Sequence, residues 1–292
     1  MLGVIGGSGI YESLGFENSY EDRIQTPFGS PSAPLEVGEV AGREVAFVPR
    51  HGRDHQYDPT TVPYRANVYA LKQAGVDQVV ATNAVGSLRE SLPPRTLVVP
   101  DRLFDRTRDR PRSFFGDGIV VHVSMAEPFC TRLAAHLADA GGATDADLVE
   151  GGTHVTIEGP QFSTRAESEF YRDRGFDTIG MTTVPEAQLA REAEMCYVPL
   201  AGVTDYDVWH DEETVSLETV LGHAAANEAS MATVLSELIE RLPDEACPCH
   251  RALADAINTP AEAIDRETRQ RVSLLIDDYL RRSGSPRATR RG

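Results

Sequence analysis

Two aspartates close an apolar stretch near residue 205. They stand in "AGVTDYDVW" (201–209) as Asp205 and Asp207. Side chains two residues apart on an extended chain point to the same side, so the two carboxyls can lie close together. Close carboxyls raise each other's pKa, and one of them can then keep a proton. A protonated Asp205 can then donate to N7 of a purine, and Asp207 can accept from its 6-amino group. A turn with two solvated acids, or a cation site, is the alternative.

A glycine turn near the N-terminus is the second group of residues that could do chemistry. In "GVIGGSGIYE" (3–12) a short apolar run leads into Gly6-Gly7-Ser8-Gly9, and backbone N–H groups of such a turn can close on an anion. The third glycine of G-x-G-x-x-G is missing and no Gly-Lys-Ser/Thr occurs. The turn therefore indicates neither a dinucleotide nor a nucleoside triphosphate. A plain strand-to-helix turn remains the structural alternative.

Polar residues that are not acidic follow three further apolar runs, in "PRHGRDH" (49–55), "ATNAVGSL" (81–88) and "GMTTVPE" (180–186). Ligands of α/β sheets gather at the carboxyl ends of strands. A guanidinium can fork two donors onto an oxyanion, and a histidine can donate or move a proton. We therefore predict a site for one free phosphate, formed by Ser8, Arg50, His51, Asn83, Ala84 and Thr182. Alternatively, the arginine pairs with a carboxylate and the histidine is structural.

The elements that must position these residues alternate along the chain. Strand-like runs are "LGVIG", "REVAFVPR", "VDQVVATN", "TLVVPDRLF", "FDTIGM" and "MCYVPLAGVT". Apolar spacing and Gly or Pro stop signals predict helices over 62–75, 125–142, 185–195, 214–242 and 261–282. An interruption of the long helix near Gly222 stays open. This alternation predicts an α/β protein with a mostly parallel or mixed sheet, and no linker divides it.

Composition excludes some partners. The chain has 292 residues and a net charge of −17, and Lys72 is its only lysine. An acidic surface repels nucleic acid and anionic membranes, and no run approaches the roughly 18 apolar residues of a membrane helix. We expect a cytoplasmic protein without nucleic-acid or membrane partners. The acid-rich, lysine-poor composition predicts adaptation to high salt, and an ordinary acidic cytosolic enzyme is the alternative.

The four cysteines are too few for a secreted disulfide framework. They are Cys130, Cys196, Cys247 and Cys249. The "CPC" motif at 247–249 leaves three possibilities: a disulfide within the motif, half of a metal site, or two free thiols. A zinc site needs about four ligands, and only His250 lies near the motif in sequence. We predict no metal at the functional site.

A set of motifs, taken together, resembles the nucleoside phosphorylase family, and within it the branch that cleaves methylthioadenosine. The resemblance runs from about residue 3 to 240 and keeps the family's order. It rests on "GGSGIYE", "PRHGRDHQYDPTTVPYRANVYALKQAG", "NAVGSLRE", "VHVSMAEPFC", "THVTIEGPQFSTRAES", "GMTTVPEAQLARE" and "TDYDVW". It implies an α/β three-layer sandwich in a single domain, with a central mixed sheet flanked by helices and a helical C-terminal region. We expect 1–245 to form this domain, 246–282 to extend it, and 283–292 to be a disordered basic tail.

The resemblance also implies roles. The six phosphate residues match the family's phosphate positions, Met181 matches the residue under the ribose, and Asp205 and Asp207 match the pair that reads the base. Phe162 and Ser163 match residues that line the base. Leu217, Val220 and Leu221 match the apolar lining of the 5′ end, and His122 matches a residue that contacts the neighbouring subunit. A homotrimer or a dimer of trimers is implied. The "CPC" motif resembles a disulfide pair of some archaeal relatives.

The expected reaction is phosphorolysis of methylthioadenosine, with Asp205, Arg50 and His51 as catalytic residues. Inorganic phosphate is a co-substrate, and no cofactor is expected. A phosphorylase of 6-oxopurine nucleosides is the nearest rival: "NAVG" also occurs there, whereas the two aspartates disfavour it because a carbonyl at position 6 suits asparagine better. A non-catalytic purine-binding regulator and a dinucleotide-dependent oxidoreductase are rivals from other classes.

Overall fold

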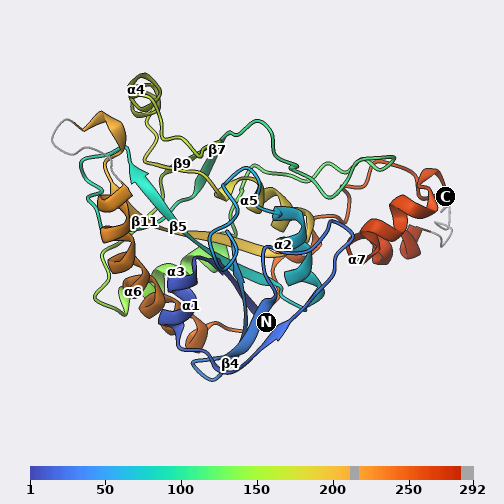
Figure 1. Cartoon of the computed structure of the whole chain (residues 1–292). Helices are drawn as coiled ribbons and strands as arrows, with labels where there is room; N and C mark the ends of the chain where they lie inside the picture. Colours follow the sequence, from blue (N-terminus) through green and yellow to red (C-terminus); the bar gives the residue numbers. More distant parts are fainter. Residues whose placement is uncertain (211–216, 284–292) are drawn as a thin grey trace, which may run out of the picture.

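A central mixed β-sheet carries helices on both faces in the computed structural model of the chain (Figure 1). The structure describes residues 1–210 and 217–283. The strands there are β1 (Leu2–Gly6), β2 (Glu17–Asp22), β3 (Leu35–Val40), β4 (Arg43–Pro49), β5 (Gln78–Ser87), β6 (Leu97–Val99), β7 (Arg102–Arg106), β8 (Leu148–Glu150), β9 (Thr153–Ile157), β10 (Thr178–Gly180) and β11 (Cys196–Asp205). The α-helices are α1 (Ser8–Leu14), α2 (Tyr64–Gln73), α3 (Thr131–Gly142), α4 (Arg165–Asp173), α5 (Thr183–Glu192), α6 (Leu217–Arg241) and α7 (Arg266–Ser283). Short 3₁₀ turns cover Asp207–Trp209, Pro248–Arg251 and Ala261–Ala263.

Four parallel strands form the centre of the sheet. β1 lies between β4 and β5 and is parallel to both, and β11 runs parallel to β5 along its other edge. The carboxyl half of β5 also pairs antiparallel with β10, which leads to β9 and β7. Because these central strands run in one direction, β1, β4, β5 and β11 end at the same edge of the sheet. This is the edge where the sequence places its polar residues.

Alternating side chains of the central strands form two cores. On β1, Ile5 joins the core under α2, α5 and α7, whereas Val4 joins the core under α1, α3 and α6. On β4, Val48 and Phe47 divide in the same way. This period of two is that of a strand buried on both faces. Figure 1 shows the same division, with α1, α3 and α6 on one side of the sheet and α2, α5 and α7 on the other.

The α/β three-layer prediction is confirmed, and its errors lie mostly at boundaries. The run 96–104 splits into β6 and β7, and α3 begins at Thr131, capped by the Cys130 side chain, instead of at 125. The polar edge strand β2 and the strands β3, β8 and β9 were not predicted, because short or polar strands lack a clear apolar alternation. The helix predicted over 261–282 begins at Arg266. No interruption occurs in α6, which continues through Gly222.

Some expectations lie outside the part of the chain that the structure describes. They are the start of the long helix at 214–216 and the tail at 284–292. Among the described helices, none combines the length and the apolar character needed to cross a membrane.

Close packing of α6 on β11 yields a first prediction. A Cβ added at Gly202 would lie 2.6 Å from Cε of Met231 and 2.8 Å from Cγ of Asn227, whose amide donates to the Val203 carbonyl. Gly202→Ala should therefore lower the free energy of unfolding by about 1–3 kcal/mol in urea titrations. Gly222→Ala is the matched control: its Cβ would meet nothing within 4 Å, and it should stabilise by roughly 0.5–1 kcal/mol. Equal stabilities of the two variants would contradict this packing.

Candidate active site

A buried ion pair between Arg50 and Glu186 joins the end of β4 to α5. Arg50 follows β4, and its Nε and Nη2 donate to the two Glu186 carboxylate oxygens at 2.5 and 3.0 Å. Its Nη1 donates to the carbonyl of Thr82 on β5 at 2.8 Å, and the hydroxyl of Tyr197 on β11 donates to Glu186. Burial lowers the pKa of Arg50, but the charge of Glu186 more than offsets it, so that the pKa lies above its ordinary value. Glu186 on α5 is thus tied to Arg50 and to β11, and Arg50 in turn is tied to β5.

This geometry changes one expectation. The sequence predicts that Arg50 forks two donors onto an oxyanion, but the fork lies on Glu186 instead. Arginine has five N–H donors. Four of these hydrogens are engaged: the one on Nε, one on Nη1, and both on Nη2, of which one makes a long 3.5 Å bond to the Ile5 carbonyl. Among the contacts of the described residues, one Nη1 hydrogen remains for a ligand.

His51 is held as a neutral imidazole. Its Nδ1 lies 2.8 Å from the Tyr57 carbonyl, which can only accept, so Nδ1 carries the hydrogen and Nε2 is left as an acceptor. Burial, and then the charge of Arg50, lower the pKa of His51 to about 4. His51 can therefore accept a hydrogen bond from a protonated phosphate oxygen, and it adds no positive charge at neutral pH.

Asn83 and Thr182 meet although 99 residues separate them. The Asn83 amide donates to the Thr182 hydroxyl oxygen at 2.7 Å, and both residues are buried. The Thr182 hydroxyl hydrogen can then donate onward to a ligand. The neighbouring Ala84 is exposed, as is Ser8, the first residue of α1 after β1. These polar groups occupy the carboxyl edge shared by β1, β4 and β5.

A carboxylate lies against the glycine turn. Cβ atoms added at Gly7 and Gly9 would lie 3.7 and 2.0 Å from the carboxylate oxygens of Glu228 on α6. Burial, and then the charge of Glu12, raise the pKa of Glu228, which favours its protonated form. The residues predicted to hold phosphate are not acidic, but two carboxylates that the sequence analysis did not consider, Glu186 and Glu228, lie next to them.

The two aspartates lie together, but not on an extended chain as their spacing suggested, because β11 ends at Asp205 and the chain turns before Asp207. The backbone N–H of Asp207 donates to Oδ1 of Asp205 at 2.8 Å, and the Thr204 hydroxyl donates to Oδ2 at 2.7 Å. The Ser168 hydroxyl on α4 donates to Oδ2 of Asp207 at 2.5 Å. Asp207 has a positive φ of 54°, a strained conformation for a residue with a side chain. Both carboxyls are buried.

Asp207 is the member of the pair that holds a proton more readily. Burial raises its pKa to about 6, and the negative charges of Asp205 and Glu167 add to the rise, against the Ser168 hydrogen bond. The sequence analysis gives the proton to Asp205. The geometry favours a proton on Asp207 instead, because Asp205 already accepts a donor on each oxygen and the pKa of Asp207 is the raised one.

β5 connects the two groups of residues. Asn83 and Gly86 lie three residues apart on this strand, or about 10 Å. Gly86 pairs with Asp205, and a Cβ at this position would lie 3.1 Å from Oδ1 of Asp205. A side chain here would press on the acid pair. The phosphate residues and the acids thus lie on one edge of the sheet, within the length of a nucleoside.

Arg110, which the sequence analysis missed, supports the region between these groups. Its buried guanidinium donates to the backbone carbonyls of Met181 and Val184 and to the carboxylate of Glu158. The side chain has no exposed surface. It therefore fixes the turn between β10 and α5, which carries both Met181 and Thr182. Its position in the arginine-rich run "DRTRDRPR" gave no signal that distinguishes it from its neighbours.

The remaining predicted residues lie at the margin of the site or away from it. Phe162 is half exposed, and Ser163 is buried with no hydrogen-bond partner for its hydroxyl among the described residues. Leu221 is exposed on α6. The side chains of Leu217 and Val220 lie outside the description. His122 is exposed on a separate segment, where its backbone N–H donates to Ala256.

A sequence profile, related sequences and related structures all indicate one protein family. The sequence profile of the Phosphorylase superfamily matches residues 1–240. The S-methyl-5′-thioadenosine phosphorylases of Koribacter versatilis and Chloroflexus aurantiacus are 45% and 46% identical, over 96% and 95% of this chain and 96% and 98% of their own. A crystal structure of a methylthioadenosine phosphorylase from an antarctic soil metagenomic library superposes with a TM-score of 0.90 at 44% identity, covering 94% of this chain and 98% of that one. A variant of the Schistosoma mansoni adenosine/methylthioadenosine phosphorylase, in complex with methylthioadenosine, has a TM-score of 0.79 at 37% identity, covering 84% and 92%.

Removing the charge of Glu186 should destabilise the fold. Glu186→Gln leaves the guanidinium of Arg50 buried without its counter-charge, and we expect a loss of about 3–5 kcal/mol in urea unfolding. Glu21→Gln is the matched control, since the Arg53–Glu21 pair lies at the surface and should contribute no measurable stability. Similar stabilities of these two variants would contradict the anchoring role of Glu186.

The raised pKa of Asp207 should appear in stability against pH. A carboxyl whose pKa rises from 3.8 to about 6 on folding stabilises the fold in its protonated form, and this contribution is lost as pH rises from about 4 to about 6. Asp207→Asn should therefore gain up to about 3 kcal/mol relative to the wild type between pH 4 and pH 7. Urea titrations of both proteins across this range measure the difference, and a constant difference would contradict the assignment.

Proposed function

This chain belongs to the Phosphorylase superfamily, and we propose that it cleaves S-methyl-5′-thioadenosine with inorganic phosphate into adenine and 5-methylthioribose 1-phosphate. The observation that carries this proposal is the near-complete match, at about 45% identity over both chains, to enzymes of that name. The site supports it, because a polar cradle and a pair of acids lie along one sheet edge. The protein is thus a pentosyltransferase of the purine nucleoside phosphorylase type.

Phosphate binds, in this proposal, at the cradle of Ser8, Asn83, Ala84 and Thr182. Thr182 donates its hydroxyl hydrogen, since its oxygen accepts from Asn83. The remaining Nη1 hydrogen of Arg50 is a further donor. The neutral His51 accepts from a protonated phosphate oxygen, which orients the nucleophile below the sugar. These donors are preorganised by buried contacts and need little rearrangement as phosphate attacks C1′.

The purine leaves toward Asp205 and Asp207. As the glycosidic bond stretches, the sugar gains positive charge next to the anionic phosphate, and the attraction grows toward the transition state. The departing adenine gains negative charge, and the aspartate pair delivers a proton to N7. The other carboxyl oxygen accepts from the 6-amino group. General acid catalysis of this kind contributes roughly 10²–10⁴-fold.

The surroundings of the nucleoside follow the same proposal. Met181 lies under the ribose on the turn that Arg110 fixes. Phe162 and Ser163 line the base, and the apolar residues at the start of α6 line the methylthio group; those residues are Leu217, Val220 and Leu221. An apolar lining suits a methylthio group, whereas a 5′-hydroxyl would need a polar partner. The reaction requires no metal or organic cofactor, because phosphate is consumed as a reactant.

The setting of the enzyme is part of the proposal. We propose a homotrimer or a dimer of trimers, in which the exposed His122 reaches the neighbouring site, with residues 1–245 as the catalytic domain and 246–282 as its extension. We also propose a cytoplasmic enzyme adapted to high salt. A cradle of neutral donors and a buried ion pair suits such conditions, because salt screens exposed charges most strongly.

One assay tests the activity. The purified protein is incubated with methylthioadenosine, adenosine or inosine, each with and without phosphate, and free base is measured by chromatography. We expect adenine from methylthioadenosine only when phosphate is present. Base release from inosine alone would identify a 6-oxopurine enzyme instead, and base release without phosphate would contradict phosphorolysis.

A substitution tests the acid pair. Asp205→Asn should lower kcat by about 10²–10⁴-fold, because the amide cannot take part in delivering the proton that N7 receives. The KM for phosphate should change little, since the cradle is unaltered. Asp139→Asn, at an exposed position of α3, is the control and should match the wild type. A near-normal rate for Asp205→Asn would rule out its role.

A further inference from the structure

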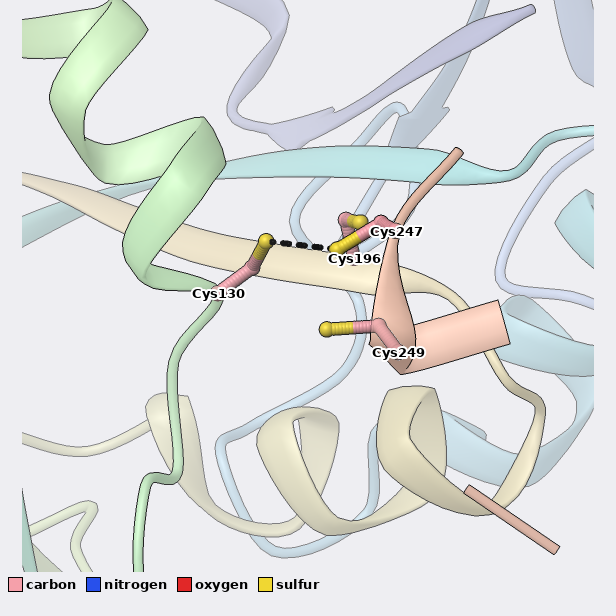
Figure 2. A group of neighbouring side chains, drawn as sticks. All are labelled: Cys130, Cys196, Cys247 and Cys249. Carbon is pink, nitrogen blue, oxygen red and sulfur yellow. Dashed lines mark hydrogen bonds between the residues drawn. The ribbon is translucent and has the colours of Figure 1, made fainter. Parts of the chain in front are cut away.

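All four cysteines of the chain meet in one buried cluster at the opposite end of β11 from the candidate active site. Cys196 begins β11, Cys130 caps α3, and Cys247 and Cys249 flank Pro248 at the start of a 3₁₀ turn. Their four sulfur atoms all lie within 4.8 Å of one another, and all four residues are buried. Figure 2 shows the side chains converging from these three segments on one small space.

We propose that this cluster binds one Zn²⁺ through four thiolates, as a closed structural site. In a tetrahedron with Zn–S bonds of about 2.3 Å, neighbouring sulfurs lie about 3.8 Å apart. The sulfurs of Cys130 and Cys247 lie 3.6 Å apart, and the 4.8 Å limit leaves only a small contraction around an ion. On binding, four thiols lose four protons and one ion gains four Zn–S bonds, with no change of oxidation state.

The groups around the sulfurs suit thiolates. A zinc ion with four thiolates carries a net charge of −2, which N–H donors and positive charges stabilise. Arg132 donates to Cys196 and Arg191 donates to Cys249, both at 3.5 Å. The backbone N–H of Leu133 donates to Cys130 at 3.5 Å. A pair of disulfides would carry no charge and would make little use of two partly buried arginine contacts.

Other bonds hold these donors in place. Arg132 also donates to Gln78 at 2.6 Å and pairs with Glu245 at 3.1 Å, and Arg191 donates to the Glu127 carbonyl as well. The Nε2 of His250 lies 3.6 Å from the sulfur of Cys196. In this proposal His250 donates to that sulfur and is not a metal ligand itself. Outer contacts of this kind orient the ligands of a metal.

The position of the cluster indicates a structural role. Cys196 and Asp205 stand at opposite ends of β11, about 30 Å apart along the strand. All four ligands come from the protein, which leaves no position for a substrate. The ion would join the start of α3 and the first strand residue of β11 to the segment that leads from α6 to α7. It would therefore fix the C-terminal region to the sheet.

Metal content is the first test. The full-length protein, purified without chelators and freed of any tag, is dialysed and measured by mass spectrometry for metals and, under denaturing conditions, for intact mass. We expect about one zinc per chain, the mass of the fully reduced chain, and thiols that react with a disulfide reagent only after denaturation with a chelator. Absence of zinc, with a mass lower by four hydrogens, would show two disulfides and overturn the proposal. Iron in place of zinc, or four free thiols that take up no added Zn²⁺, would also overturn it.

Two variants make the test specific. Cys249→Ser should lose the stoichiometric zinc and lower Tm by about 10 °C, whereas His250→Gln should keep both. Phosphorolysis at 25 °C by the folded zinc-free protein should stay within about twofold of the holoprotein, because the site lies far from the reacting atoms. Should Cys249→Ser not fold, the zinc content and mass of the wild type still decide. Full zinc in Cys249→Ser, or its loss in His250→Gln, would contradict the four-sulfur assignment.

Discussion

The ion pair of Arg50 and Glu186 is the contact on which the candidate site depends. Both charges are almost completely excluded from water, and a buried charge is tolerated only when its partner and its remaining hydrogen bonds are in place. The pair therefore requires that the end of β4, the first turns of α5, the Thr82 carbonyl of β5 and the Tyr197 hydroxyl of β11 keep one arrangement. The residues proposed to hold phosphate lie next to these anchors.

The same constraint explains the electrostatics of the cradle. Glu186 neutralises Arg50, and burial keeps His51 neutral, so the proposed phosphate cradle would recognise an anion mainly through hydrogen-bond donors. A chain with a net charge of −17 gains little from long-range attraction of phosphate. At the other end of the site, burial and the neighbouring carboxylates make Asp207 a proton carrier near neutral pH. The two ends thus differ in the charge that they favour, as the two ends of a phosphorolysis reaction require.

Local patterns were sufficient for part of this structure. The polar residues after apolar runs indicated the sheet edge on which Asn83 and Asp205 lie. The spacing of Asp205 and Asp207 did not give their arrangement, because the chain turns after Asp205. The partner of Arg50 could not be predicted, because 136 residues separate it from Glu186 and only the order of the strands brings them together. Arg110 could not be told apart from the neighbouring arginines either, because only the fold brings it to Glu158, Met181 and Val184. The sequence also left "CPC" with one nearby candidate ligand, His250, whereas folding brings Cys130 and Cys196 to it. Roles of individual site residues remain predictions.

A crystal structure with adenine and phosphate bound is the most direct measurement of the central claim, that one cavity at the carboxyl edge of the sheet holds both. The account predicts phosphate within hydrogen-bond distance of Thr182 and of an Nη1 hydrogen of Arg50, with the Arg50–Glu186 pair intact, and adenine with N7 facing Asp205 and Asp207. Phosphate and adenine in separate cavities, or an adenine whose N7 faces away from both carboxyls, would contradict it.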